Sequence, residues 1–482
     1  MKEFMKDNNR MIVNIIIPLL LFIAGFVWKF IFIDARDVCI DEPFTIFNAQ
    51  KSLKEILLLP TQNEPNPPLF MFILSLWIRI TGISAASVRL VPLFFNALTP
   101  VFLYLAGKKL SNYWGGITAA GLFILSSYQF YFGMETRTYS LQLCATAAAL
   151  YFMYSLIMDP ARKWHFAGLI ITNIILVYSH YFGWFVVFME AVTCIFYYGR
   201  KAAIRKILLA VVAAAVSFLP MAMTVVRQFM ISKDQTWVKP PESSVYRREL
   251  IMFLNNPLVI QVTAVVLIAG IGFFLLGKRK KQIPWHYLTL ILFWFLPYTF
   301  MFFISYKVPM FENRYVMYNS IGLYMTIGVL TGFLYAHLRY VLPVAVATVL
   351  IAMGIKMQTS LEFIAYRETR KAVEYVKSNK DSNTLVIIHP YWNDFEFTYY
   401  FDRNIFRDVP NMQQRLRDTM VYQVWGLEDA KIYLDRYDAD KVLFFRGGSG
   451  FDEINNYLDS LYVRKDSIFF PDCYYIYSYI KE

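Results

Sequence analysis

The stretch MIVNIIIPLLLFIAGFVWKFIFIDARDVCIDEP, residues 11–43, decides the fold class of this chain. Its apolar part, residues 11–33, is long enough to cross a hydrocarbon core of roughly 30 Å. An acidic loop follows at once and contains the adjacent carboxylates of Asp41 and Glu42. Such a pair is costly next to a membrane and is easiest to explain if it binds a metal ion, accepts a proton, or does both. The stretch therefore predicts a membrane protein with chemistry in its first loop.

The composition supports this fold class. The chain is 57% hydrophobic and 18% aromatic, with only 17% charged residues. Apolar runs of membrane-spanning length recur along it. An additional apolar run, residues 68–81, is too short to cross alone and predicts an interfacial or re-entrant helix. The predicted spans are eleven: 11–33, 87–107, 113–132, 138–157, 164–179, 183–198, 207–225, 257–276, 285–304, 315–335 and 339–356.

The distribution of charge predicts the orientation. With a cytoplasmic N-terminus, the inner segments carry sixteen Lys and Arg residues against three acids, which is a strong positive-inside signal. The net charge of +12 therefore reflects topology and gives no reason to expect a nucleic-acid partner. An odd number of spans places the C-terminus outside. Residues 11–33 lack a small-residue cleavage site and predict a signal anchor in the plasma or inner membrane.

The chain changes character after residue 356. Residues 357–482 contain sixteen basic and twenty acidic residues and no predicted span. A helical pattern at 368–377 and short apolar runs at 384–389, 441–446 and 473–480 predict a small α/β domain. We therefore expect an α-helical polytopic membrane protein with about eleven transmembrane helices and interfacial helices. Its two parts are a transmembrane domain (1–356) whose catalytic first outer loop is 34–67, and an outer soluble α/β domain (357–482).

The predicted topology brings several polar motifs to the outer ends of the spans. An arginine at headgroup level suits a phosphate because its planar fork gives paired, charge-assisted hydrogen bonds. A nearby carboxylate suits a metal ion or a general base. The chemistry that fits is group transfer from a lipid phosphate to an external hydroxyl or amine. The motifs supply Glu64, Arg89, Glu135, Arg137, Tyr139, His180, Tyr181, Glu312 and Arg314.

These motifs also carry a family resemblance. Asp41-Glu42 in the first loop is followed by Pro67-Pro68-Leu69-Phe70, Arg137-Thr-Tyr139, His180-Tyr181 and Glu312-Asn-Arg314-Tyr315. This order resembles the family 39 glycosyltransferases of the C-type membrane-embedded superfamily, which includes protein O-mannosyltransferases and the enzymes that add aminoarabinose to lipid A. The resemblance covers roughly residues 11–335. One departure is Asn66, where relatives often have histidine.

The resemblance implies that Asp41 is the acidic residue of the active site and that the donor is a polyprenyl-phosphate sugar. We expect an inverting single displacement in which Asp41 takes the proton of the acceptor. Arg137, Arg314 and Arg89 are expected to bind the donor phosphate. Glu42 is the second catalytic carboxylate, and Asp41 with Glu64 is a candidate site for a divalent ion such as Mg, Mn or Zn. The expected supporting or substrate-binding residues are Glu64, Glu135, Tyr139, His180, Tyr181 and Glu312.

Other interpretations stay open. Asp41 and Glu42 could cap a helix that starts at Pro43. The arginines could extend to lipid headgroups or form structural Glu-Arg pairs, and His180 could be a buried hydrogen-bonding residue. A transporter or flippase of a lipid-linked sugar is the main alternative function. The acids lie on one face rather than at the midplane, and the sequence has no inverted repeat, which argues against transport.

Overall fold

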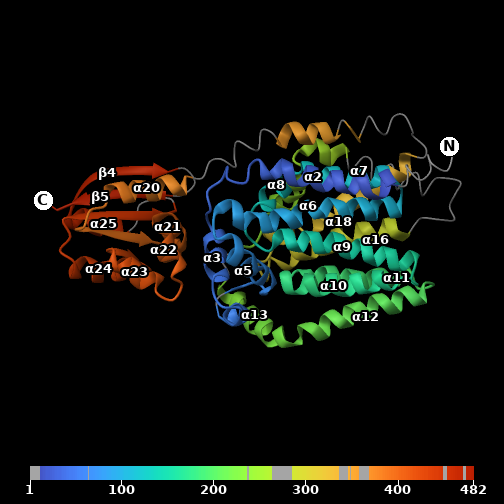
Figure 1. Ribbon diagram of the computed structural model, residues 1–482, viewed down its shortest axis with the longest axis horizontal. Helices are drawn as coiled ribbons and strands as arrows, with labels where there is room; N and C mark the ends of the chain where they lie inside the picture. Colours follow the sequence, from blue (N-terminus) through green and yellow to red (C-terminus); the bar gives the residue numbers. More distant parts are fainter. Residues whose placement is uncertain are drawn as a thin grey trace. The chain divides into compact units, whose positions relative to one another are not determined.

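The computed structural model describes residues 11–62, 64–235, 238–262, 285–335, 346–347, 349–357, 368–448, 453–470 and 474–481. The chain forms two compact units, both visible in Figure 1. The helical unit comprises Met1–Ile31, Leu57–Ile73 and Arg89–Leu361, and the sheet unit comprises Phe32–Ile56, Leu74–Val88 and Glu362–Glu482. The sheet unit thus combines parts of the first loop region with the C-terminal region, a grouping that the sequence did not predict.

The helical unit is a bundle of apolar helices. Among the described residues, five helices are long and apolar enough to cross a membrane: Ile12–Phe30, Ala85–Leu110, Tyr139–Met158, Lys201–Ile231 and Trp285–Ile304. The predicted spans 257–276 and 339–356 extend into residues outside the described part, so the total of eleven stays a prediction. The helices of the bundle are η1 (Ile12–Ile16), α2 (Ile17–Phe30), α6 (Ala85–Leu110), α7 (Tyr113–Leu125), α8 (Ser127–Gly133), α9 (Tyr139–Met158), α10 (Lys163–Ser179), α11 (Gly183–Phe196), α12 (Lys201–Phe218), α13 (Ala222–Gln235), α14 (Ser243–Phe253), α16 (Trp285–Ile304), α17 (Asn313–Val316) and α18 (Asn319–Tyr335).

Two local features of the bundle follow from single residues. The predicted span 113–132 is divided at Ser126, whose hydroxyl accepts from the backbone N–H of Gln129 and caps α8. Helices α7 and α18 approach closely at Gly115 and Gly328. A Cβ atom added to Gly115 would lie 2.7 Å from the carbonyl oxygen of Gly328, so only glycine allows this spacing. The apolar run at 68–81 forms the short helix α5 (Leu69–Thr81), as predicted.

The sheet unit is built on five strands in the order β2-β1-β3-β5-β4. Strand β1 (Thr384–His389) is parallel to β2 (Val421–Gln423) and to β3 (Lys441–Gly447). Strand β5 (Tyr474–Ile480) is antiparallel to both β3 and β4 (Val463–Phe470). The three predicted strands are present, and the predicted helix is α20 (Thr369–Asn379). The other helices along this part of the chain are α21 (Asp394–Phe401), α22 (Arg403–Arg407), α23 (Met412–Asp418), α24 (Leu427–Arg436) and α25 (Glu453–Leu461).

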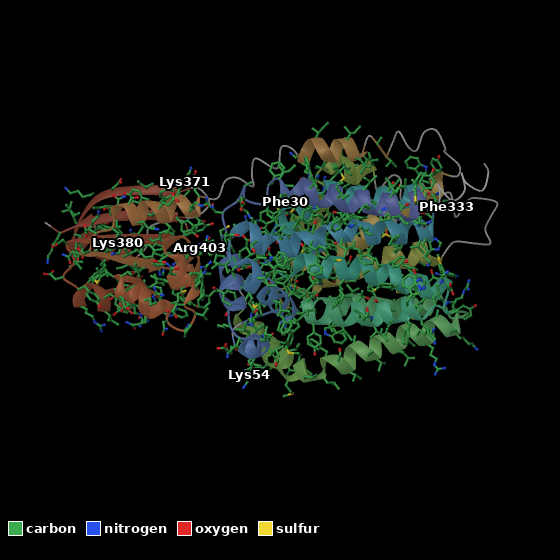
Figure 2. The ribbon with its side chains drawn as sticks, in the orientation of Figure 1. Phe30, Lys54, Phe333, Lys371, Lys380 and Arg403 are labelled. Carbon is green, nitrogen blue, oxygen red and sulfur yellow. The ribbon has the colours of Figure 1, made fainter. Side chains whose placement is uncertain are left out.

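Part of the first loop packs onto the sheet unit's helices α21 and α22. Helix α3 (Asp41–Ala49) places Phe47 against Phe395 and Phe406, with ring centroids 4.7 and 5.6 Å apart. Arg403, labelled in Figure 2, donates from Nη1 to the carbonyl oxygen of Ile83 at 3.0 Å. These contacts fix the surroundings of helix α3, which begins with the acidic pair.

Candidate functional site

Asp41 is the first residue of helix α3 in the sheet unit. The helix begins two residues earlier than the sequence suggested, so the capping position belongs to Ile40 and not to Asp41. The Asp41 side chain is partly exposed. A carboxylate in the first turn is stabilised by the helix dipole. The position leaves Asp41 accessible to a reactant, as a general base requires.

The backbone immediately before Asp41 is strained. Ile40 has φ 57° and ψ −113°, a conformation that normally requires glycine. Its N–H donates to Oε1 of Glu396 at 3.0 Å, and the N–H of Val38 donates to the Tyr400 hydroxyl at 2.5 Å. Such strain persists only where the surroundings impose it, and it is often found at functional sites. Helix α21 therefore supplies two of the hydrogen bonds that hold the loop before Asp41.

Glu42 lies in a different environment from its neighbour. Its Oε2 is 3.5 Å from Nη2 of Arg36, and the two side chains are 1% and 4% exposed. Removal of the cationic partner of a buried carboxylate strongly destabilises the folded protein, because an unpaired charge is left buried. This pairing favours a structural role for Glu42 over the predicted catalytic one.

In the helical unit, Glu64 is held by hydrogen bonds to its side chain and its backbone. Its Oε1 accepts from the backbone N–H and the side-chain amide of Asn66, at 3.1 and 2.8 Å. Nε2 of Gln228 donates to the carbonyl oxygens of Pro60 and Glu64, at 2.6 and 2.7 Å. Nη2 of Arg137 lies 3.9 Å from Glu64 Oε1. Asn66, the departure from relatives, thus orients the carboxylate that faces Arg137.

Arg137 lies on the segment between α8 and α9. The hydroxyl of the next residue, Thr138, donates to the carbonyl oxygen of Ser179 at 2.7 Å. That bond ties the segment to the end of α10, directly before His180. Arg137 is only 6% exposed. A buried guanidinium beside a carboxylate is a fixed positive charge and does not behave like an arginine that extends to headgroups.

His180 is a buried ring on which the charges of two arginines act. Burial, together with the charges of Arg137 and Arg314, lowers the pKa of His180 from 6.5 to about 3. Its Nδ1 accepts from the N–H of Phe182 at 3.2 Å, which places the proton on Nε2. That buried Nε2 has no hydrogen-bond partner among the described residues. The ring therefore offers an unused N–H donor in a positive environment.

Two tyrosine rings lie close to the His180 ring. The His180 ring centroid lies 5.7 Å from that of Tyr315 and 6.3 Å from that of Tyr139. The guanidinium of Arg314 is 5.7 Å from the Tyr315 centroid. The backbone N–H of Arg314 donates to Oδ1 of Asn313 at 2.5 Å. Two predicted site motifs, far apart in sequence, are thus brought together at His180.

The other predicted residues lie in different surroundings. Tyr181 follows His180 directly, and burial and then the charge of Glu64 raise the pKa of its hydroxyl. Glu135 and Tyr139 are buried, and Arg89 is 1% exposed, which argues against the interpretation that Arg89 extends to headgroups. Glu312 is the capping residue before α17. The structure therefore gathers Glu64, Arg137, His180, Tyr181, Arg314 and Tyr315 in the helical unit, while Asp41 and Glu42 belong to the sheet unit.

Sequence reasoning missed Gln228 and Glu249. Gln228 gave no signal because an amide on an apolar helix is uninformative by itself. Glu249 lies on α14, in a segment outside the predicted spans, and is 2% exposed. Burial raises the pKa of the Glu249 carboxyl to about 7; Arg248, with Nε 3.6 Å from its Oε1, opposes the shift, and Glu312 adds to it.

Replacement of Glu249 by glutamine is expected to flatten the pH dependence of stability. The folded chain binds the proton of the Glu249 carboxyl more tightly than the unfolded chain does. The contribution of this protonation to the stability of the fold is therefore complete below a pH of about 4.5 and is lost as the pH rises through about 7. Thermal unfolding of purified wild type and Glu249→Gln, measured from about pH 5 to about pH 8, should diverge toward the alkaline end, with the variant the more stable. The exposed Glu242, just before the same helix, provides the control Glu242→Gln, which should follow the wild type. Parallel profiles for Glu249→Gln and wild type would contradict the expected titration.

The predicted metal site receives no support from the side chains. Within the described ranges, no group of three His, Cys, Asp or Glu side chains could hold a metal ion. Glu64 faces the cation of Arg137 and accepts two hydrogen bonds from Asn66 at one oxygen. That donor set suits an ion pair better than a metal ligand. Metal binding by Asp41 and Glu64 stays a prediction, and no step below depends on it.

Comparison with known proteins supports the resemblance that the motifs suggested. The sequence profile of the dolichyl-phosphate-mannose-protein mannosyltransferase family matches residues 65–226. The resemblance is confirmed. This segment contains Arg137 and His180 and covers about a third of the chain. Among curated proteins, none matches.

Solved structures share the fold of this chain. ArnT from Cupriavidus metallidurans in the apo state is 10% identical, with a TM-score of 0.58, and the alignment covers 98% of each chain. A structure of the same protein bound to undecaprenyl phosphate is 12% identical, with a TM-score of 0.58 over 95% of this chain and 97% of that one. The apo oligosaccharyltransferase of Archaeoglobus fulgidus is 10% identical, with a TM-score of 0.51 over 88% of this chain and 69% of that one. At such low identity the similarity concerns the fold.

Proposed function

We propose that this protein transfers a sugar from a polyprenyl-phosphate donor to an acceptor hydroxyl or amine on the outer face of the cell membrane. The observation that carries the proposal is the buried His180, whose Nε2 has no partner among the described residues and whose ring lies 5.7 Å from that of Tyr315, the residue after Arg314. Two guanidiniums and an unused N–H donor suit a phosphate, whose charge increases when the sugar departs. The fold shared with ArnT, one structure of which binds undecaprenyl phosphate, supports a lipid-linked phosphate as the ligand.

The protein residues divide the work as follows. Arg137 and Arg314 bind the phosphate, and Glu64 with Asn66 fixes the orientation of Arg137. Asp41 takes the proton from the acceptor, which attacks the sugar carbon as the bond to the phosphate oxygen breaks. A single displacement of this kind inverts the configuration at that carbon. The N-terminus is cytoplasmic in this proposal, so the acceptor approaches from outside.

Mass spectrometry of lipid extracts tests the proposal. A strain that lacks this protein should accumulate one polyprenyl-phosphate sugar, because the reaction that consumes it is gone. Complementation with the wild-type chain should remove the accumulated lipid, and complementation with the Asp41→Asn variant should not. An unchanged lipid profile in the deletion strain would contradict the proposed donor class.

A further inference from the structure

The sheet unit has a crevice-forming topology that the proposed reaction does not use. From β1 the chain moves to β2 on one side, and the next strand, β3, lies on the other side of β1. The carboxyl ends of β1 and β3, where His389 is paired with Arg446, therefore form a topological switch point. In open sheets with parallel strands, ligands bind outside the strand ends at such a point.

Three aromatic side chains lie just beyond the carboxyl ends of β1 and of β2, its neighbour on the other side. Tyr391 and Trp392 follow β1, and Trp425 follows β2. The Trp425 ring is stacked on Tyr391 with centroids 3.6 Å apart and an angle of 25° between the planes. Trp392 lies next to the same tyrosine, at 5.3 Å and 76°. We call Tyr391, Trp392 and Trp425 the aromatic platform.

The two indoles of the platform are exposed although they are large and apolar, and Tyr391 is half-buried. Trp425 is 70% exposed and Trp392 is 61% exposed. The position of Trp425 is fixed by its backbone N–H, which donates to Oδ2 of Asp429 on α24 at 3.0 Å. One face of the Trp425 indole rests on Tyr391, which leaves the opposite face for a ligand. An exposed aromatic cluster held in place in this way indicates a binding surface.

A buried polar group adjoins the platform. Asn393 is 8% exposed, and its Nδ2 has no hydrogen-bond partner in the part of the chain that the structure describes. It lies against the end of β3, where a Cβ atom added to Gly447 would be 2.2 Å from that nitrogen. A buried donor without a partner costs free energy, which an acceptor oxygen on a ligand would recover.

We propose that the aromatic platform binds a saccharide. A sugar ring presents C–H groups on its face and oxygen atoms around its edge. The C–H groups are attracted to the electron-rich face of an indole, and the edge oxygens can accept from an amide such as Asn393. The inference rests on the proposed function in one respect, that the saccharide is part of the acceptor.

Binding can be measured without any donor. Full-length protein in phosphatidylcholine nanodiscs is titrated into fluorescein-labelled tetrasaccharides of mannose, glucose, galactose or N-acetylglucosamine, and anisotropy is recorded. At least one tetrasaccharide should bind to the wild type. Trp425→Ala should weaken that binding by about tenfold or more, and Trp425→Tyr, which keeps an aromatic face, should recover most of it. The control is Phe469→Ala on β4, another exposed aromatic position, at which binding should be unchanged.

The outcomes separate this inference from the proposed function. If none of the four tetrasaccharides binds, or if Trp425→Ala binds as well as the wild type, the saccharide surface is wrong. Nitroxide-labelled lipid should quench the tryptophan fluorescence of the wild type and of Trp425→Ala to the same extent, through the tryptophans of the helical bundle. If the quenched fraction is smaller in Trp425→Ala, the platform contacts the membrane and the inference is also wrong. The third outcome combines the two experiments. If the purified protein binds a tetrasaccharide through Trp425 but the deletion strain accumulates no polyprenyl-phosphate sugar, only the proposed function is contradicted.

Discussion

Asp41→Asn is expected to lower the turnover of sugar transfer by at least about 100-fold, the low end of the range for a general base. The substitution keeps the size of the side chain and its ability to form hydrogen bonds, but it removes the proton acceptor. Asp41 is the first residue of α3, and the strained Ile40 before it is held by helix α21. Donor affinity and protein yield should change little, because the base acts on the acceptor.

The control for this prediction is Asp34→Asn, at an exposed carboxylate in the same loop. It should retain turnover close to that of the wild type. Initial rates at saturating donor, with both variants purified in parallel, are the required measurement. An Asp41→Asn variant with near-normal turnover would return Asp41 to the structural role of an acidic residue in the first turn of a helix.

Hydropathy was sufficient to predict much of the helical unit. Long helices such as Ala85–Leu110 and Tyr139–Met158 follow from continuous apolar runs, which need few tertiary details. The division at Ser126 was missed because a serine hydroxyl can also be accommodated within a helix. Strands β1 and β3 were predicted because they are buried and apolar. Strand β4 was missed because it is an edge strand, with Arg464, Lys465 and Asp466 exposed.

The candidate site was predictable as a set of residues but not as a geometry. The sequence indicates that Arg137, His180 and Arg314 lie at the ends of helices, and the structure brings them together. The sequence could not indicate that Glu42 forms an ion pair with Arg36, because many other basic residues were possible partners. Nor could it indicate that parts of the first loop region pack with the C-terminal region, since that grouping depends on contacts between residues more than 300 positions apart, such as those of Ile40 with Glu396.

Arg137→Lys and Arg314→Lys are each expected to weaken donor binding by about 1–3 kcal/mol, or roughly 5- to 150-fold. Lysine keeps the charge but loses the planar fork that gives paired hydrogen bonds to phosphate. The charges of both arginines also act on the neutral ring of His180. Each substitution therefore changes the environment of the Nε2–H group of His180. Titration of purified variants with the polyprenyl-phosphate sugar gives the affinities.

The matched control is Arg227→Lys, at an exposed position on α13 next to Gln228. It should bind the donor as the wild type does. Polyprenyl phosphate without a sugar should compete with the donor for the wild-type site, because the two guanidiniums and His180 recognise phosphate. If the arginines only extended to headgroups, substitution by lysine would not change donor affinity, because a lysine side chain reaches the headgroups equally well. Unchanged affinity in both variants would therefore assign the phosphate to other cations, with the buried Arg89 as the next to be tested.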